Sequence, residues 1–143
     1  MKYKDPTNQL LEAYQKLLEG KISYGGQSVA VGTKIPRRKN RYVLLFVEAI
    51  NNYSTGDKAI YNATMAIQIV DMQELGEGDE SVANSIMEQI LPLVDNPNSF
   101  PMADFQCLTA NFGDMEPGNE TNETNYIITK KLRMNHFIEQ LNV

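Results

Sequence analysis

The chain has 143 residues, of which 42% are hydrophobic, and it carries a formal net charge of −5. This length predicts one domain with one core. No run approaches the roughly 20 apolar residues of a membrane-spanning helix, and the N-terminus lacks the apolar centre of a signal peptide, so we expect neither a membrane protein nor an exported one. Cys107 is the only cysteine, which rules out an internal disulfide and favours a reducing compartment.

Charge is divided unevenly along the chain. Residues 1–41 contain nine Lys and Arg against three acids, a net charge of +6, whereas residues 42–143 contain four against fifteen, a net charge of −11. Such polarity suits head-to-tail association of identical chains, although a mixed, solvated surface explains it about equally well. A generally basic nucleic-acid-binding protein is not indicated.

The first predicted elements are a helix and a short strand. Asp5 and Pro6 form a good helix start, and apolar residues recur on one side up to Gly20, so a helix is predicted from about 6 to 19. The segment "SVAVGT", residues 28–33, reads as a short strand. A basic cluster follows it, made of Arg37, Arg38, Lys39 and Arg41. We expect this cluster to contact either an acidic face of a neighbouring subunit or nucleic-acid phosphate, and the acidic remainder of the chain slightly favours the subunit. A solvated loop is an equal alternative to either contact.

Two long apolar runs come next. Residues 41–51, "RYVLLFVEAIN", and residues 58–72 are separated by the turn-forming "YSTGDK", which predicts a long antiparallel hairpin. The first run is apolar on both faces, which is unusual for a strand in so small a chain. The acidic segment "ELGEGDE", residues 74–80, is predicted to be a loop.

The last elements are a second helix and a second pair of strands. Asp79 or Ser81 can cap a helix from about 81 to 91, which Pro92 is expected to end. Strands are predicted at 105–112 and 126–138. Between them, the polar and glycine-containing residues 113–125 are predicted to form a mobile or partner-binding loop, and residues 20–40 a second mobile region.

The predicted fold class is α+β, in the order α-β-β-β-α-β-β, with a mostly antiparallel sheet of four or five strands and two helices packed on one face. Two such helices cover one face of the sheet, so one face of the strand at 41–51 needs another cover, which a folded-over loop, a curled sheet or a neighbouring subunit would supply. The neighbouring subunit is the explanation with a functional consequence. The candidate subunit interface therefore includes the basic cluster and either Val43, Leu45 and Val47 or the alternate face that carries Glu48.

No pattern for catalysis, cofactor binding or metal binding is recognisable. The single histidine, His136, lies in a strand pattern beside no predicted nucleophile, and Cys107 lies in an apolar run typical of a buried thiol. One Cys and one His are too few ligands for zinc, and no glycine-rich phosphate-binding loop has the required spacing. An unrecognised enzyme would need an acid or base from Glu48, Asp71, Asp104 or His136.

The order and lengths of these elements resemble those of tail-terminator or tail-completion proteins of long-tailed bacteriophages, the group similar to minor tail protein U. The resemblance rests on the helix "PTNQLLEAYQKLLEG", the hairpin "YVLLFVEAINNYSTGDKAIYNATMAIQIVD", the helix "SVANSIMEQILPLV" and the final "NYIITKKLRMNHFI". It covers nearly the whole chain, but residues 113–125 have no place in the family pattern.

The resemblance implies a virion protein, made in the host cytoplasm, that forms a ring of typically six subunits. Such a ring caps the tail tube, joins it to the neck or connector, and lets the genome DNA pass through its lumen without sequence-specific binding. A neck ring of another symmetry is a related possibility. The resemblance implies neither a catalytic residue nor a cofactor nor a membrane. A small binding module whose half-open sheet holds a peptide or an apolar ligand is the alternative from a different class.

Overall fold

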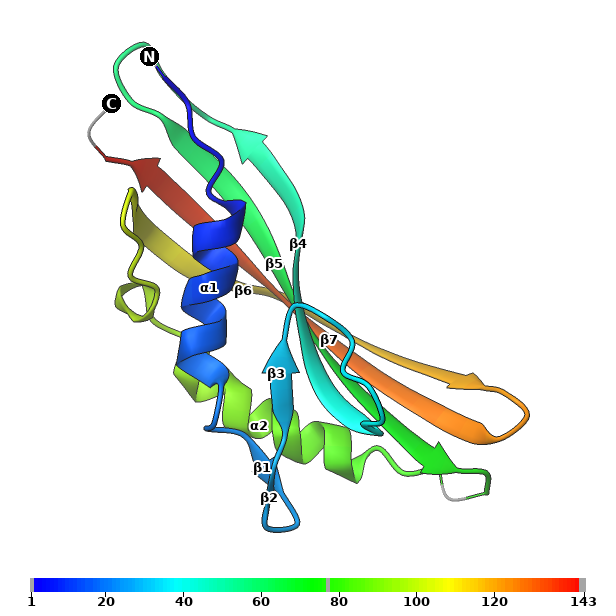
Figure 1. Cartoon of the computed structure of the whole chain (residues 1–143). Coiled ribbons are helices and arrows are strands. Elements are labelled where there is room, and N and C mark those ends of the chain that lie inside the picture. The colour runs from blue at the N-terminus through cyan, green and yellow to red at the C-terminus, as the bar shows by residue number, and fades with distance from the viewer. Residues whose placement is uncertain (1, 77, 142–143) are drawn as a thin grey trace.

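The computed structural model, which describes residues 2–76 and 78–141, shows two α-helices against a twisted sheet of five strands (Figure 1). The α+β class is therefore correct. In chain order the elements are α1 (Thr7–Leu18), β1 (Ser23–Tyr24), β2 (Gln27–Ser28), β3 (Ala30–Gly32), β4 (Arg41–Asn52), β5 (Ile60–Glu74), α2 (Ser81–Val94), the 3₁₀ helix η1 (Pro97–Ser99), β6 (Phe105–Thr121) and β7 (Asn125–Gln140).

The strands of the main sheet lie in the order β3-β4-β5-β7-β6. The predicted long hairpin is confirmed as β4 and β5, whose antiparallel register runs from Arg41 opposite Asp71 to Asn52 opposite Tyr61. β5 pairs with β7, and β7 with β6, in antiparallel fashion, whereas β3 pairs with β4 in parallel. β1 and β2 form a separate two-stranded sheet, so the observed element order contains strands that the predicted order lacks.

The first helix begins where its local sequence indicates. The Asp5 carboxylate accepts hydrogen bonds from the backbone N–H and the hydroxyl of Thr7, 2.9 and 2.6 Å long, which satisfies one of the free N–H groups at the start of α1. Leu10, Tyr14 and Leu18 recur along one side of α1 and are fully buried. The sequence therefore specified both the start and the buried face of this helix.

The second helix continues past the residue at which it was expected to stop. Pro92 lies inside α2, which ends at Val94 instead of Leu91. Proline lacks a backbone N–H and so removes one helical hydrogen bond, a loss that is small this close to the end of a helix. Val94 is buried, and the burial of its side chain offsets that loss.

Both helices lie in front of the sheet in Figure 1. α1 contacts β4, and α2 contacts β5 and β7. The core fills the space between the helices and the sheet, where the largest fully buried side chains include Tyr14, Phe100, Leu45, Met65, Ile67, Ile69, Ile86, Met87 and Ile90.

The largest difference from the sequence prediction is in residues 113–125. These residues are not a loop: β6 continues to Thr121, and only residues 122–124 form the turn before β7. The Asn122 side-chain oxygen accepts the backbone N–H groups of Thr124 and Asn125 and closes this turn. In Figure 1 the resulting hairpin projects beyond the helices at one end of the molecule.

An edge strand tolerates the residues that suggested a loop. β6 pairs only with β7, so Pro117, which has no N–H to donate, breaks no bond on the free side. The register shifts between Phe112 and Asp114, and a Cβ atom at Gly113 would lie 2.9 Å from the Arg133 carbonyl oxygen. Glycine is therefore needed at this bulge.

The predicted loop region at 20–40 also contains short strands, namely β1, β2 and β3, and only residues 33–40 connect β3 to β4 without regular structure. Glu77 of the acidic loop lies outside the described residues. Among the described helices, none is both long enough and apolar enough to span a membrane.

Candidate interaction surfaces

The two faces of β4 have different surroundings. Val43 and Leu45 are each 1% exposed, lie in the core beneath the helices, and offer almost no surface to a neighbour. Val47 is partly buried against the same core. The expectation that Val43 and Leu45 form a subunit interface is therefore corrected, because α1 packs on the face that they occupy. The face left uncovered is the alternate one, which carries Leu44, Phe46 and Glu48.

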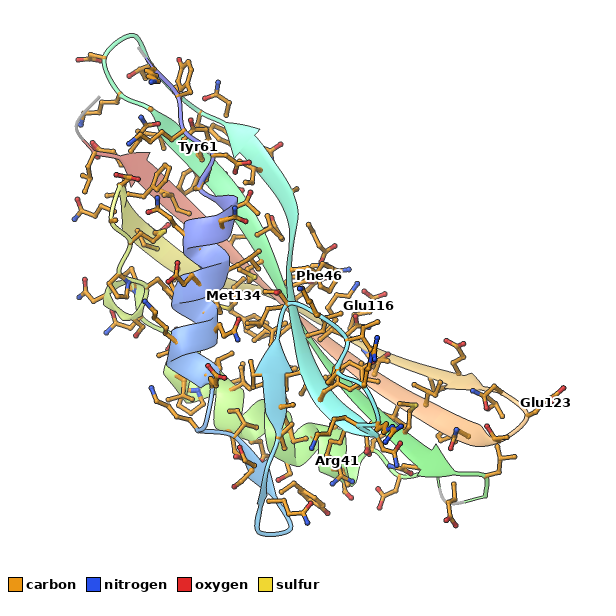
Figure 2. The ribbon with its side chains drawn as sticks, viewed as in Figure 1. Arg41, Phe46, Tyr61, Glu116, Glu123 and Met134 are labelled. Atoms are coloured by element: carbon orange, nitrogen blue, oxygen red, sulfur yellow. The ribbon has the colours of Figure 1, made fainter. Side chains whose placement is uncertain are left out.

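We define the open face as the side of the sheet away from the helices. Across it, the register aligns Phe46 of β4 with Ala66 of β5, Arg133 of β7 and Asp114 of β6. Figure 2 shows Phe46 and Glu116 on this side, and Met134 toward the helices. The open face combines apolar side chains of β4 with charged side chains of β7 and β6.

Arg133 is the centre of the charged part of the open face. Its guanidinium contacts Glu48 at 2.8 Å, Asp114 at 3.2 Å and Glu116 at 2.9 Å. The small side chain of Ala66 leaves room for Arg133 to reach over β5 to Glu48 on β4. The hydrogen bonds from Arg133 to Glu116, Glu48 and Asp114 raise the pKa of its guanidinium further above its usual range. Glu48 is thus paired within its own chain.

A cation also contacts the aromatic side chain on this face. The Lys131 ammonium lies 5.4 Å from the centre of the Phe46 ring, within the range of a cation–π contact. The aliphatic stem of Lys131 can cover part of the ring while its charge stays in water. Phe46 and Leu44 are accordingly half-buried, whereas Val43 and Leu45 are fully buried.

The basic cluster lies at the opposite edge of the sheet from β6. Arg37, Arg38 and Lys39 are exposed, and within the described part of the chain none of them pairs with a carboxylate. Arg41 differs, because its Nε donates to the buried Asp71 carboxylate at 3.1 Å and its guanidinium lies 4.7 Å from the centre of the Tyr24 ring. Arg41 therefore fixes the start of β4, and the other three cations remain available to a partner.

A polar groove of about 360 Å³ runs beside this cluster. Its lining includes Arg38, Lys39 and Arg41 together with Tyr24 and residues 27–30. The concentration of positive charge makes it attractive to a carboxylate or a phosphate.

An apolar pocket of about 350 Å³ lies near the β6 edge. It is lined by Leu91, Pro92, Val94, Asp95, Phe112 and Met134. Phe112 and Met134 are directly opposite each other on β6 and β7, and Phe112 is 52% exposed. An exposed aromatic side chain beside an apolar hollow is a feature of surfaces that bind another molecule.

The side chains that an enzyme could use as an acid or a base make structural contacts within the fold. Ala63 O can only accept, so His136 Nδ1 carries the proton and donates to it at 3.1 Å, and His136 Nε2 accepts from the Tyr14 hydroxyl at 2.6 Å. Burial lowers the pKa of His136 and raises that of Tyr14. His136 is fully buried, and together with Tyr14 and Phe100 it forms an aromatic cluster that joins α1 to β7.

Cys107 and Asp104 are also engaged. Burial raises the pKa of the Cys107 thiol to about 11, so the thiol is protonated and unreactive near neutral pH. A hydrogen bond from Gln9, assisted by Lys4, lowers the pKa of Asp104. Among the described residues, no three His, Cys, Asp or Glu side chains are arranged to hold a metal ion.

Comparison with known proteins provides no family assignment. No protein-family model matches the sequence, and no curated protein is significantly similar to it. Function is therefore proposed from the surfaces of this chain together with the resemblance in the order and lengths of its elements.

Two features of these surfaces were missed from the sequence. Arg133 follows Lys130 and Lys131 in a strand pattern, and nothing local indicates that three carboxylates converge on it. Phe112 was placed at the end of a strand, and only the next residue, Gly113, signals a bulge that changes the direction of neighbouring side chains.

Proposed function

We propose that this protein is a non-enzymatic structural subunit of a phage tail or neck. In this proposal, copies associate into a ring that terminates the tail tube and joins it to the head-proximal connector. Genome DNA passes through the lumen without sequence-specific binding. The family resemblance implies that this ring has six subunits, and a neck ring of another symmetry fits the same surfaces.

The observation that carries this proposal is the opposite charge of the two edges of the sheet. β6, at one edge, contains Asp114, Glu116 and Glu120 and neither Lys nor Arg. Asp114 and Glu116 share the single cation Arg133 with Glu48, so their group keeps a net negative charge. Residues 33–40, which follow β3 at the other edge, contain four basic residues and no acid. Edges of opposite charge attract when identical copies lie side by side, and a repeated contact of this kind closes into a ring when the rotation per copy allows it.

The open face supports the same proposal. Leu44 and Phe46 are only half-buried there, beside a charged group that Arg133 holds in place. Protein interfaces combine an apolar core with a polar rim, and on this face Leu44 and Phe46 would supply the apolar part and the charged group the polar part. In a ring, this face would be turned either toward the next subunit or toward a tail or connector protein.

A search for the protein in purified virions tests this function. We expect mass spectrometry to detect it in intact particles and antibody labelling to place it at the junction of tail and head. Fractionation into heads and tails provides the control, because a tail terminator should remain with the tails. A protein that is made during infection but is absent from particles would contradict the proposal.

A small binding module is the second candidate, and the long free edge of β6 is the observation in its favour. An extended peptide can pair with an exposed strand edge and extend the sheet. This function predicts a monomer that retains a specific peptide or apolar ligand through purification. Native mass spectrometry would reveal the added mass, and a ligand-free protein that assembles with itself would argue against the module.

A further inference from the structure

Ile35 is unusually exposed for an isoleucine. It lies in the connection between β3 and β4 and is 68% exposed, more than any other large hydrophobic side chain in the described part of the chain. Because Pro36 follows it, the backbone at Ile35 is restricted to extended conformations. Its charged neighbours are all basic, namely Lys34, Arg37, Arg38 and Lys39. Ile35 is thus an apolar side chain that projects from a basic loop.

The pocket near β6 has the complementary character. Leu91, Val94, Phe112 and Met134 make its lining apolar, and Asp95 adds an exposed carboxylate. Within the described residues Asp95 makes no ion pair, so its charge is available to a partner. The acidic side chains Asp114 and Glu116 of β6 lie on the open face, where they pair with Arg133, so Asp95 is the carboxylate that lines the pocket itself.

We propose that Ile35 of one copy inserts into this pocket of a second copy, with the flanking cations of residues 34–39 lying against Asp95. This contact rests on the proposed function and specifies how the copies associate. The apolar side chain provides burial, and the charges determine which edge it meets.

The position of the two surfaces determines the kind of assembly. Residues 33–40 follow the edge strand β3, and Phe112 belongs to the other edge strand, β6. Each copy offers an Ile35 loop on one side and a pocket on the other, so every contact leaves one of each unused. Such a heterologous contact produces a ring or a filament and not a closed dimer.

Cross-linking between two cysteine variants tests the contact. Ile35→Cys and Asp95→Cys are prepared separately, mixed at high concentration and treated with a short bismaleimide. Both positions are exposed, so both variants should fold, and the native Cys107 is buried with its pKa raised to about 11, so it should not react. We expect covalent dimers in the mixture and few in either variant alone. A mixture of Tyr53→Cys and Asp95→Cys is the control, since Tyr53 is exposed but lies in the turn after β4.

Substitutions provide the second measurement. We expect Ile35→Asp and Asp95→Lys each to weaken self-association at least tenfold, and Tyr53→Asp, the matched control, to change it less than twofold. Ile35→Leu should retain association, because it keeps an apolar side chain of the same size. Circular dichroism verifies that each variant is folded.

The outcomes separate this contact from the proposed function. A wild-type protein that assembles, but shows no cross-link and no loss with Ile35→Asp, would overturn the contact and leave the ring proposal standing. Dimers formed by Ile35→Cys alone would also overturn it, because they indicate a symmetric contact. A wild type that is monomeric at every concentration would overturn both.

Discussion

The buried histidine should make the stability of this protein depend on pH in a range where little else titrates. His136 is the single histidine, its two ring nitrogens contact Tyr14 and the Ala63 carbonyl, and burial lowers its pKa in the folded state. As pH falls through about 6.5, the ordinary histidine value, the unfolded chain therefore binds the histidine proton before the folded protein does. The contribution of neutral His136 to the free energy of unfolding should therefore be fully present above that pH and decrease below it.

The size of the effect follows from one proton. The free energy of unfolding should fall by at most about 1.4 kcal/mol between pH 7.5 and pH 5.5, the limit that is reached when His136 stays unprotonated in the folded protein over this whole range. For a domain of this length that corresponds to a decrease of roughly 5 °C in Tm. Urea unfolding followed by circular dichroism at several pH values measures it, with His136→Gln as control. Gln can still accept from Tyr14 but does not titrate, so its slope should be nearly flat. Equal slopes in the two proteins would refute the reasoning.

Three further predictions concern packing and the open face. Leu45→Asp should abolish folding, because it places a charge in the core. Leu44→Asp changes the neighbouring leucine on the open face and should leave a folded protein that assembles less well. Circular dichroism measures folding and light scattering measures assembly, and equal effects of the two substitutions would contradict the assignment of faces. Tyr14→Phe should lower the free energy of unfolding by about 1–3 kcal/mol, because His136 Nε2 loses the Tyr14 hydroxyl, its hydrogen-bond partner among the described residues. Urea titration measures this loss, and an unchanged midpoint of unfolding would argue against the hydrogen bond. Arg133→Met should lower Tm at low salt by leaving three carboxylates without their cation. It should lower Tm by much less at high salt, where screening reduces their repulsion, and the same loss at both salt concentrations would indicate packing instead of charge.

The elements could be predicted where local rules act alone. Alternating apolar residues and the turn at "YSTGDK" specify the β4–β5 hairpin, and Asp5 and the leucine spacing specify α1. The prediction of a loop at 113–125 was wrong because glycine and proline weaken a central strand but are accepted in an edge strand, and a sequence alone does not reveal which strand is at the edge.

The faces of β4 could not be distinguished for a similar reason. Both faces are apolar, so periodicity left open whether Leu44 or Leu45 would meet the helices, and the packing of α1 decided it. Glu48 was a useful signal, because a carboxylate favours the open face, but its partner Arg133 comes from a strand two positions away in the sheet. Contacts between distant strands depend on register, which tertiary packing fixes.

The molar mass of the purified protein, measured by light scattering over a wide range of concentration, tests self-association into a ring most directly. We expect the mass to rise from 16.1 kDa, the mass of one chain, to a single fixed multiple and then to stay constant, because a closed ring has a defined number of subunits. A mass that remains at 16.1 kDa at every concentration, or that stops at a dimer, would contradict the account.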